Sequence, residues 1–241
     1  MPSILHIEST TKACSVGLSH SGQMIALRES VSLEYSHSSS LTVFMEDVMR
    51  EAGKKPSDID AVAVSHGPGS YTGLRIGVSA AKGFCYALDI PLIAIDTMKA
   101  LTNTALQKLA GQEGLVSPAA IEAVFCPMID ARRMEVYYAL YRYDLLPMQE
   151  TRAEVIEENT FSKILEDYKI FFFGDGAGKC RNLINSCNAM FIDDIWPSAI
   201  GMPQEAEQKY EQGEFVDLAY FEPFYLKDFV AGKPKVKGLF S

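Results

Sequence analysis

Hydrophobic residues near the start of the chain fall into three short runs separated by polar turns. Residues 4–7 are mainly apolar, residues 14–18 alternate between apolar and polar side chains, and residues 24–27 follow a Ser-Gly turn. Runs of this length and alternation are typical of β-strands. Three strands in succession predict a meander, which differs from a fold with strictly alternating strands and helices.

The next apolar stripe has the spacing of one helical face, i, i+3, i+4, i+7, i+8 and i+11. It consists of Leu41, Phe44, Met45, Val48, Met49 and Ala52, and Gly53 after it predicts the end of the helix. Such a face fits a helix that packs on a core. It also fits a partner surface, because Met and aromatic residues are enriched where helices dock. The pattern leaves both interpretations open.

Two further strands and a helix are predicted before residue 96. Residues 61–65 form a compact apolar run, residues 72–88 follow a Gly-Pro-Gly loop with helical character, and residues 92–95 form another apolar run. The sequence Asp-Ile-Pro at 89–91 predicts the end of the helix, because proline cannot continue it. The first part of the chain is therefore expected to contain three strands, a helix, a strand, a helix and a strand.

A similar order begins again in the second part of the chain. Residues 123–129 and 134–141 are expected to pair around a turn at 130–133, followed by a helix at 161–168 and a strand at 170–173. The polar stretch at 110–117, which contains two glycines, is the best boundary. We therefore expect an N-terminal lobe at 1–109, a C-terminal lobe at 110–228 and a tail at 229–241.

Charge and composition narrow the class of protein. The 241 residues include 22 basic and 31 acidic ones, so the net charge is -9. Nucleic-acid affinity depends largely on Lys and Arg that neutralise phosphates, so tight binding of tRNA by the chain alone is not expected. No stretch approaches the ~18 apolar residues of a membrane span, and no signal peptide is recognised at the start. Five scattered cysteines without a C-x-x-C pair favour reduced thiols in the cytoplasm.

The segment between residues 67 and 77 is the most informative motif. It reads Gly67-Pro68-Gly69-Ser70-Tyr71-Thr72-Gly73-Leu74-Arg75-Ile76-Gly77 and lies between a predicted strand and a predicted helix. Backbone N–H groups at a helix start can bind an anion, but the spacing departs from the dinucleotide fingerprint. A nucleotide or anion site therefore stays open for Gly67, Pro68, Gly69, Ser70, Tyr71, Thr72 and Arg75. Gly73, Gly77 and Ala81 share a helix face, and we interpret them as positions where another helix approaches closely.

The sequence gives only weak support for a P-loop, a metal site or a hydrolase site. The second glycine-rich segment, residues 174–179, would need Gly at 173 and Ser or Thr at 180 to match a P-loop, but Phe173 and Cys180 stand there. A tight turn that needs positive φ explains its glycines. The four histidines never recur at i, i+4, and no G-x-S-x-G elbow is present. No catalytic residue, metal site or cofactor is expected.

Four motifs in order resemble the TsaB family, formerly called YeaZ, over essentially the whole chain. They are Ile4-Leu5-His6-Ile7-Glu8-Ser9-Thr10-Thr11, the segment from Gly67 to Gly77, Asp130-Ala131-Arg132-Arg133-Met134-Glu135-Val136-Tyr137, and Pro223-Phe224-Tyr225-Leu226-Lys227. The segment from Gly67 to Gly77 is highly specific for this family. One departure is Glu8, where the family usually has Asp, and no ligand role is assigned to it.

The resemblance implies an α/β fold of the actin-like, sugar-kinase-like kind, with two ribonuclease-H-like lobes of which the second is abbreviated. It implies a partnership with the catalytic paralogue TsaD and the ATPase TsaE, and a homodimer when the chain is alone. These proteins transfer a threonylcarbamoyl group to the adenosine next to the anticodon. The paralogue's metal-binding H-x-x-x-H pair is absent, because Leu41 stands four residues after His37.

The resemblance also implies that the first two helices form the partner interface. That makes Leu41, Phe44, Met45, Val48, Met49, Gly73, Gly77 and Ala81 interface candidates. The expected function is a non-catalytic scaffold subunit. The alternative is an ATP-binding or hydrolytic enzyme of the same fold, but fold analogy alone supports it weakly.

Overall fold

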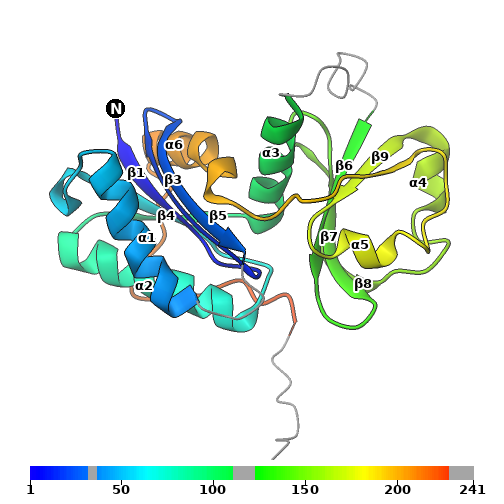
Figure 1. Cartoon of the computed structure of the whole chain (residues 1–241), viewed down its shortest axis with the longest axis horizontal. Coiled ribbons are helices and arrows are strands. Elements are labelled where there is room, and N and C mark those ends of the chain that lie inside the picture. Colours follow the sequence, from blue (N-terminus) through cyan, green and yellow to red (C-terminus); the bar gives the residue numbers. More distant parts are fainter. Residues whose placement is uncertain (32–36, 111–122, 228–241) are drawn as a thin grey trace, which may run out of the picture.

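The computed structural model describes residues 1–31, 37–110 and 123–227, which form two lobes side by side (Figure 1). The expected tail at 229–241 and nearly all of the expected boundary at 110–117 lie outside the described residues.

The first lobe is built on a five-stranded mixed sheet. Its strands are β1 (Ser3–Glu8), β2 (Ala13–His20), β3 (Gln23–Val31), β4 (Ala61–Ser65) and β5 (Leu92–Ile95), in the spatial order β3-β2-β1-β4-β5. β1 pairs antiparallel with β2 and parallel with β4. The expected meander of the first three strands is confirmed. Each strand is longer than the apolar run that predicted it, and β3 extends four residues further.

Helices cover both faces of this sheet. α1 (His37–Glu51) and α2 (Tyr71–Leu88) pack on one face, where Leu5 and Ile7 of β1 join the core. Ile4 points to the opposite face, because successive side chains of a strand alternate. There it meets the short 3-10 helix η3 (Ala199–Gly201) and α6 (Pro203–Gln212). A further 3-10 turn, η1 (Pro56–Asp58), precedes β4.

The second lobe repeats the same strand order. Its strands are β6 (Ala123–Asp130), β7 (Glu135–Tyr141), β8 (Pro147–Val155), β9 (Lys169–Phe173) and β10 (Ala189–Phe191), arranged β10-β9-β6-β7-β8. α4 (Ser162–Asp167) and α5 (Ala177–Cys180) are short. The repeated order confirms two ribonuclease-H-like lobes, and the short helices agree with an abbreviated second lobe.

One helix lies between the sheets and was not predicted. α3 (Thr97–Ala110) presents Met98, Leu101 and Ala105 to a core that also contains Phe125 and Phe173 of the second sheet. Its Ala100 packs in the core beneath α6 instead. α3 therefore contributes to the cores of both lobes and holds them together (Figure 1).

The last described segment returns to the first lobe. α6 packs on the first sheet, and Val216 forms an antiparallel bridge with Leu92 at the edge of that sheet. Among the cysteines, four are buried as expected, whereas Cys187 is exposed. No helix in the described part of the chain is both long enough and apolar enough to cross a membrane.

Candidate functional site

The glycine-rich loop after β4 is packed tightly against the turn between β1 and β2. The N–H of Ser70 donates to the carbonyl of Thr10 at 2.6 Å. A Cβ on Gly69 would lie 2.5 Å from that same oxygen. Gly67 has φ +129°, a backbone conformation that residues with side chains rarely adopt. A Cβ on Gly67 would also clash with the carbonyl oxygen of Phe224. These glycines are required by packing.

Several hydrogen-bonding groups of this loop have partners within the chain. The Oγ of Ser70 caps α2 by accepting from the N–H of Gly73 at 3.3 Å. The N–H of Gly67 donates to the Oγ1 of Thr97 at 3.0 Å. The Ser70 cap satisfies a backbone N–H that has no partner within the helix. Together these bonds fix the start of α2, which lies beside the cleft between the lobes.

A cleft of about 500 Å³ separates the lobes at this point. The first lobe contributes the β1–β2 turn and the start of α2. The second lobe contributes the end of β6, the β6–β7 turn, one residue of β7 and the turn after β9. The lining residues are Thr10, Thr11, Lys12, Gly69, Ser70, Tyr71, Thr72, Ile129, Asp130, Ala131, Arg132, Tyr137, Asp175, Phe224, Tyr225, Leu226 and Lys227. Hydroxyl, aromatic and charged groups therefore dominate its wall.

A C-terminal strap, residues 223–227, forms the third side of the cleft. The N–H of Phe224 donates to the carbonyl of His66 at 2.7 Å, and the ring of Tyr225 lies 4.9 Å from that of Tyr71. Lys227 forms an ion pair with Glu135 of the second lobe. The strap thus contacts both lobes, and it brings the motif at residues 223–227 next to the motifs that end β1, begin α2 and join β6 to β7.

Glu8 at the end of β1 is fully buried and engaged by its neighbours. Its carboxylate accepts from the N–H of Thr10 at 2.7 Å and from the Thr10 hydroxyl at 2.5 Å, and the Ser65 hydroxyl donates to it as well. Burial raises the pKa of Glu8, and these hydrogen bonds partly offset that effect. The carboxylate holds the β1–β2 turn together.

The second glycine-rich segment, residues 174–179, packs against the β6–β7 hairpin and bonds to its turn. Gly174 has φ +98°, which confirms the expected positive-φ turn at this position, whereas Gly176 has φ -85° and Gly178 is not left-handed. Lys179 donates to the carbonyls of Arg133 at 2.9 Å and Glu135 at 2.7 Å, and it pairs with Asp130. The lysine that a P-loop would direct to a phosphate is therefore fixed to the β6–β7 turn.

Asp175 lines the cleft from the second lobe. Its Oδ1 accepts from the N–H of Asp130 at 3.1 Å. Burial, the largest influence, raises the pKa of Asp175 to about 6, and the Asp130 carboxylate also raises it, whereas the Asp130 N–H and Lys179 lower it. Sequence reasoning missed Asp175, Lys12 and Tyr137 as parts of one site. No signal in the sequence joins residues that come from three separate turns and strands.

The predicted interface residues are largely internal. Leu41, Met45, Val48 and Met49 are buried in the core of the first lobe, and only Phe44 of that set is half-buried at its edge. For these four residues the prediction of an exposed partner surface is corrected. The cause is that this face of α1 packs on the first sheet.

The close approach at Gly73 and Gly77 is also internal. A Cβ at Gly73 would lie 2.1 Å from the carbonyl oxygen of Ser9, and one at Gly77 would lie 2.3 Å from the Ser9 hydroxyl. Ala81 is buried in the same core. The expected neighbour was another helix, and the observed neighbour is the β1–β2 turn.

The histidines do not form a common site. The Nε2 of His6 lies 2.7 Å from the Ser19 hydroxyl inside the sheet, and the ring of His66 lies edge-on to Phe221 and Phe224. The side chain of His37 is outside the described residues. Within the described ranges, no three His, Cys, Asp or Glu side chains are grouped as metal ligands would be.

Comparison with known proteins agrees with this geometry. A family profile described as "TsaD: tRNA N6-adenosine threonylcarbamoyltransferase" matches residues 32–186, more than half of the chain. The tRNA threonylcarbamoyladenosine biosynthesis protein TsaB of Escherichia coli is 29% identical over 236 residues, which cover 95% of this chain and 96% of that protein. The protein of the same name in Haemophilus influenzae is 27% identical, with 95% of each chain covered.

Solved structures point the same way. YeaZ from Pseudomonas aeruginosa matches with a TM-score of 0.78 at 26% identity, over 94% of this chain and 100% of that one. The fold is therefore that of YeaZ, with two α/β lobes that each contain a five-stranded mixed sheet. The chain belongs to the TsaD family and, within it, to the TsaB (YeaZ) type, which takes part in tRNA threonylcarbamoyladenosine biosynthesis.

Proposed function

We propose that the chain is the non-catalytic subunit that supports TsaD in the transfer of a threonylcarbamoyl group to N6 of the adenosine next to the anticodon. The observation that carries this proposal is that the two charged groups beside the glycine-rich loops are both hydrogen-bonded within the chain. Glu8 is buried and bonded to Thr10 and Ser65, and Lys179 is bonded to the β6–β7 turn. Neither group is free to bind a substrate or orient a phosphate.

The position of Leu41 supports the same proposal. A metal site of the H-x-x-x-H kind needs a second imidazole four residues after His37. Leu41 stands there and is buried in the core of the first lobe. An apolar side chain offers no ligand atom, so α1 lacks the pair that the catalytic paralogue is expected to use.

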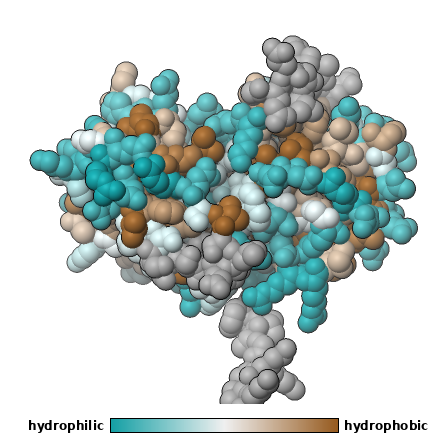
Figure 2. Space-filling model, in the orientation of Figure 1, coloured by the Kyte–Doolittle hydropathy of each residue, from teal (hydrophilic) through white to brown (hydrophobic). Residues whose placement is uncertain are grey.

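The outer faces of α1 and α2 are the surface that we propose for TsaD, and for a second copy of the chain when TsaD is absent. Tyr86 is 84% exposed and Val43 is 52% exposed. Exposed Gly83 has nothing within 4 Å of where its Cβ would lie, so a partner helix can come close. Tyrosine is frequent among residues that dominate binding energy. Figure 2 shows hydrophobic residues scattered among hydrophilic ones on the face in view. A surface of this composition can still bind a partner, because non-obligate interfaces are only about as apolar as the rest of a protein surface.

The other members of the assembly follow from this function. We place the ATPase TsaE in the same complex, with this chain working in the cytoplasm on tRNA that TsaD modifies. The chain itself then needs no cofactor.

A second candidate function rests on the cleft. Its volume of about 500 Å³ and the exposed side chains of Lys12 and Thr72 in its wall would suit a nucleotide, so an ATP-binding or hydrolytic enzyme is the alternative. Titration calorimetry with ATP and magnesium separates the two. Micromolar binding favours the enzyme, and the absence of heat favours the scaffold.

The assembly itself is tested by size-exclusion chromatography with light scattering on the chain mixed with TsaD. We expect a heterodimer that Tyr86→Ala weakens. The matched control is Tyr143→Ala, which removes an exposed tyrosine from the second lobe and should leave the heterodimer intact. A mixture in which both proteins elute separately would contradict the proposal.

A further inference from the structure

Two consecutive arginines adopt an unfavourable backbone conformation at the tip of the β6–β7 hairpin. Arg132 has φ 71° and Arg133 has φ 53°, which is the left-handed region that residues other than glycine rarely enter. Strained positions of this kind concentrate where the strain serves a function. The sequence places neither Gly nor Asn here, although both would fit the turn with less strain.

The turn is held from inside, so its shape does not depend on the two guanidinium groups. The N–H of Arg132 donates to the Oδ1 of Asp130 at 2.9 Å, and Lys179 donates to the carbonyls of Arg133 and Glu135. Both arginine side chains are exposed. The backbone is fixed, and the charged ends extend into solvent.

The positive charges near the cleft fall into two classes. Lys179 and Lys227 form ion pairs with Asp130 and Glu135. In contrast, the side chains of Lys12, Arg132 and Arg133 make no hydrogen bond or ion pair with any residue that the structure describes. On a chain whose net charge is -9, three unpaired cations in one neighbourhood form a distinct local site.

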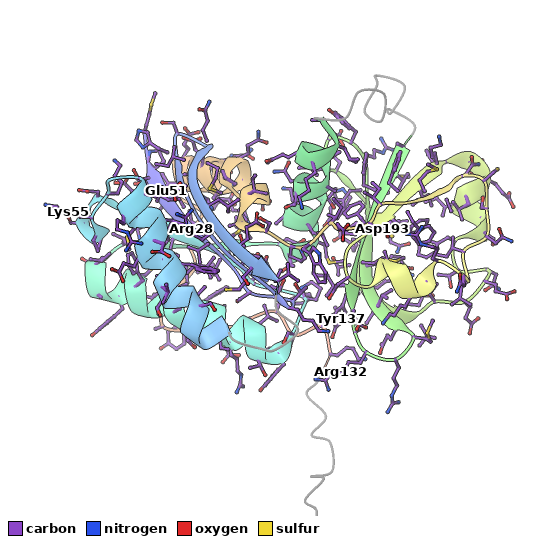
Figure 3. The ribbon with its side chains drawn as sticks, viewed as in Figure 1. Arg28, Glu51, Lys55, Arg132, Tyr137 and Asp193 are labelled. Atoms are coloured by element: carbon purple, nitrogen blue, oxygen red, sulfur yellow. The ribbon has the colours of Figure 1, made fainter. Side chains whose placement is uncertain are left out.

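Two of these cations line the cleft, where the carboxylates of Asp130 and Asp175 also lie, and the third is the next residue in sequence. Lys12 of the first lobe and Arg132 of the second both line the cleft, together with Tyr71 and Tyr137. Arg133 lies outside the lining, one residue further along the hairpin tip. Figure 3 shows Arg132 at the tip of the hairpin, with Tyr137 closer to the junction of the lobes. The positive charge therefore extends one residue beyond the cleft lining.

We propose that Lys12, Arg132 and Arg133 bind successive phosphates of an RNA strand, and that Tyr137 offers its ring to a base at the mouth of the cleft. A polyanion fits better than a single nucleotide, because Arg133 adds a positive charge beyond the cleft lining. Exposed cations combined with aromatic rings are the usual means of binding a nucleic-acid strand. The inference rests on the proposed function for its choice of RNA, since the complex works on tRNA.

The test uses a labelled tRNA transcript and fluorescence anisotropy over a series of salt concentrations, with the chain in complex with TsaD. The variant Arg132→Gly/Arg133→Gly removes both charges and suits the left-handed turn, so folding is preserved. Two lost phosphate contacts should reduce the salt slope of log Kobs by roughly 1.4 to 1.8. They should weaken binding by about tenfold or more at 0.1 M salt. The matched control is Lys54→Ala/Lys55→Ala, which removes two charges between α1 and η1. Figure 3 shows Lys55 at the end of the first lobe that is far from Arg132.

Three outcomes decide the inference. A reduced slope for the arginine variant with an unchanged slope for the lysine variant supports it. Equal slopes for wild type and both variants overturn it. A loss of binding for Arg132→Gly, with none for Arg133→Gly and with full competition by free AMP, also overturns it, because the cleft then takes one nucleotide. If TsaD does not associate, the same series on the chain alone at low salt still tests the inference separately from the proposed function.

Discussion

The backbone of α2 at Gly73 lies against Ser9 in the β1–β2 turn. The Ser9 hydroxyl donates to the carbonyl of Gly73 at 2.9 Å, and a Cβ at Gly73 would stand 2.1 Å from the Ser9 carbonyl oxygen. Real Cβ atoms do not approach backbone oxygen so closely, so the helix and the turn must separate if a side chain is added. The segment from Gly67 to Gly77, the most specific motif of the sequence, therefore packs α2 against the β1–β2 turn of the first lobe.

Gly73→Ala should destabilise the protein by about 1–3 kcal/mol, because overpacking a tight contact forces backbone shifts. Urea unfolding followed by circular dichroism measures the change. If Gly73 instead faced a partner helix, the isolated chain would keep its stability and lose only partner binding.

Gly83→Ala in the same helix is the matched control. A Cβ there meets nothing within 4 Å, so the substitution should stabilise the chain by roughly 0.5–1 kcal/mol through the lower entropy cost of alanine. Equal effects at positions 73 and 83 would refute the packing account.

Met45 and Tyr86 should separate the core from the proposed interface. Met45→Ala should lower the free energy of unfolding by about 2–5 kcal/mol, independently of protein concentration, because the side chain is buried. Tyr86→Ala should change stability by less than about 0.5 kcal/mol. It should nevertheless weaken association with TsaD by roughly tenfold, the equivalent of about 1.4 kcal/mol. Thermal scans at several concentrations, with calorimetry against TsaD, measure both quantities, and unchanged affinity for Tyr86→Ala would move the interface elsewhere.

Much of the first lobe can be predicted from sequence because its strands are apolar and its helices periodic. The run at residues 61–65 coincides with β4, and residues 92–95 coincide with β5. The elements that sequence reasoning missed lack such patterns. α3 buries Thr102 and Thr104, whose hydroxyls bond to carbonyls one turn earlier, so its buried face looks polar. α6 buries little beyond Pro203 and Ala206.

The site is harder to predict than the fold. The glycine-rich loops and the motif at residues 223–227 are visible in sequence, but their meeting at one cleft depends on tertiary structure. The apolar stripe on α1 shows that periodicity alone cannot distinguish a core face from an interface. A buried face and an interface face have the same spacing, and only the sheet beneath α1 distinguishes them.

Asp175 should make stability fall as pH rises. Its pKa is raised to about 6 in the folded chain, whereas an unfolded aspartate titrates near 4, so between these values the folded state binds more protons. Stability is therefore full below about pH 4 and decreases up to about pH 6. Asp175→Asn keeps the acceptor for the Asp130 N–H and removes the charge. Because the side chain is half-buried and solvent in the cleft still screens its charge, we expect a gain of about 1–2 kcal/mol at pH 7.5 and almost none at pH 4. Urea unfolding at the two pH values measures this, and an equal gain at both would show that the charge is not responsible.

The isolated chain should bind tRNA weakly at physiological salt. Its net charge is -9, so phosphates are repelled except near the three unpaired cations. Anisotropy with a labelled transcript at 0.15 M salt should give no sub-micromolar dissociation constant for the chain alone. A sub-micromolar value without TsaD would contradict the expectation that a partner completes the RNA site.

The most direct test of the central claim is a reconstituted threonylcarbamoyl-transfer assay. It combines tRNA, ATP, threonine, bicarbonate and the enzyme TsaC, which makes the threonylcarbamoyl adenylate, with TsaD and TsaE present or absent. Because Glu8 and Lys179 are bonded within the chain, we expect no modified adenosine when the chain is supplied without TsaD. We expect product when all components are present, and its loss when this chain is left out. Modified tRNA formed by the chain without TsaD would contradict the account.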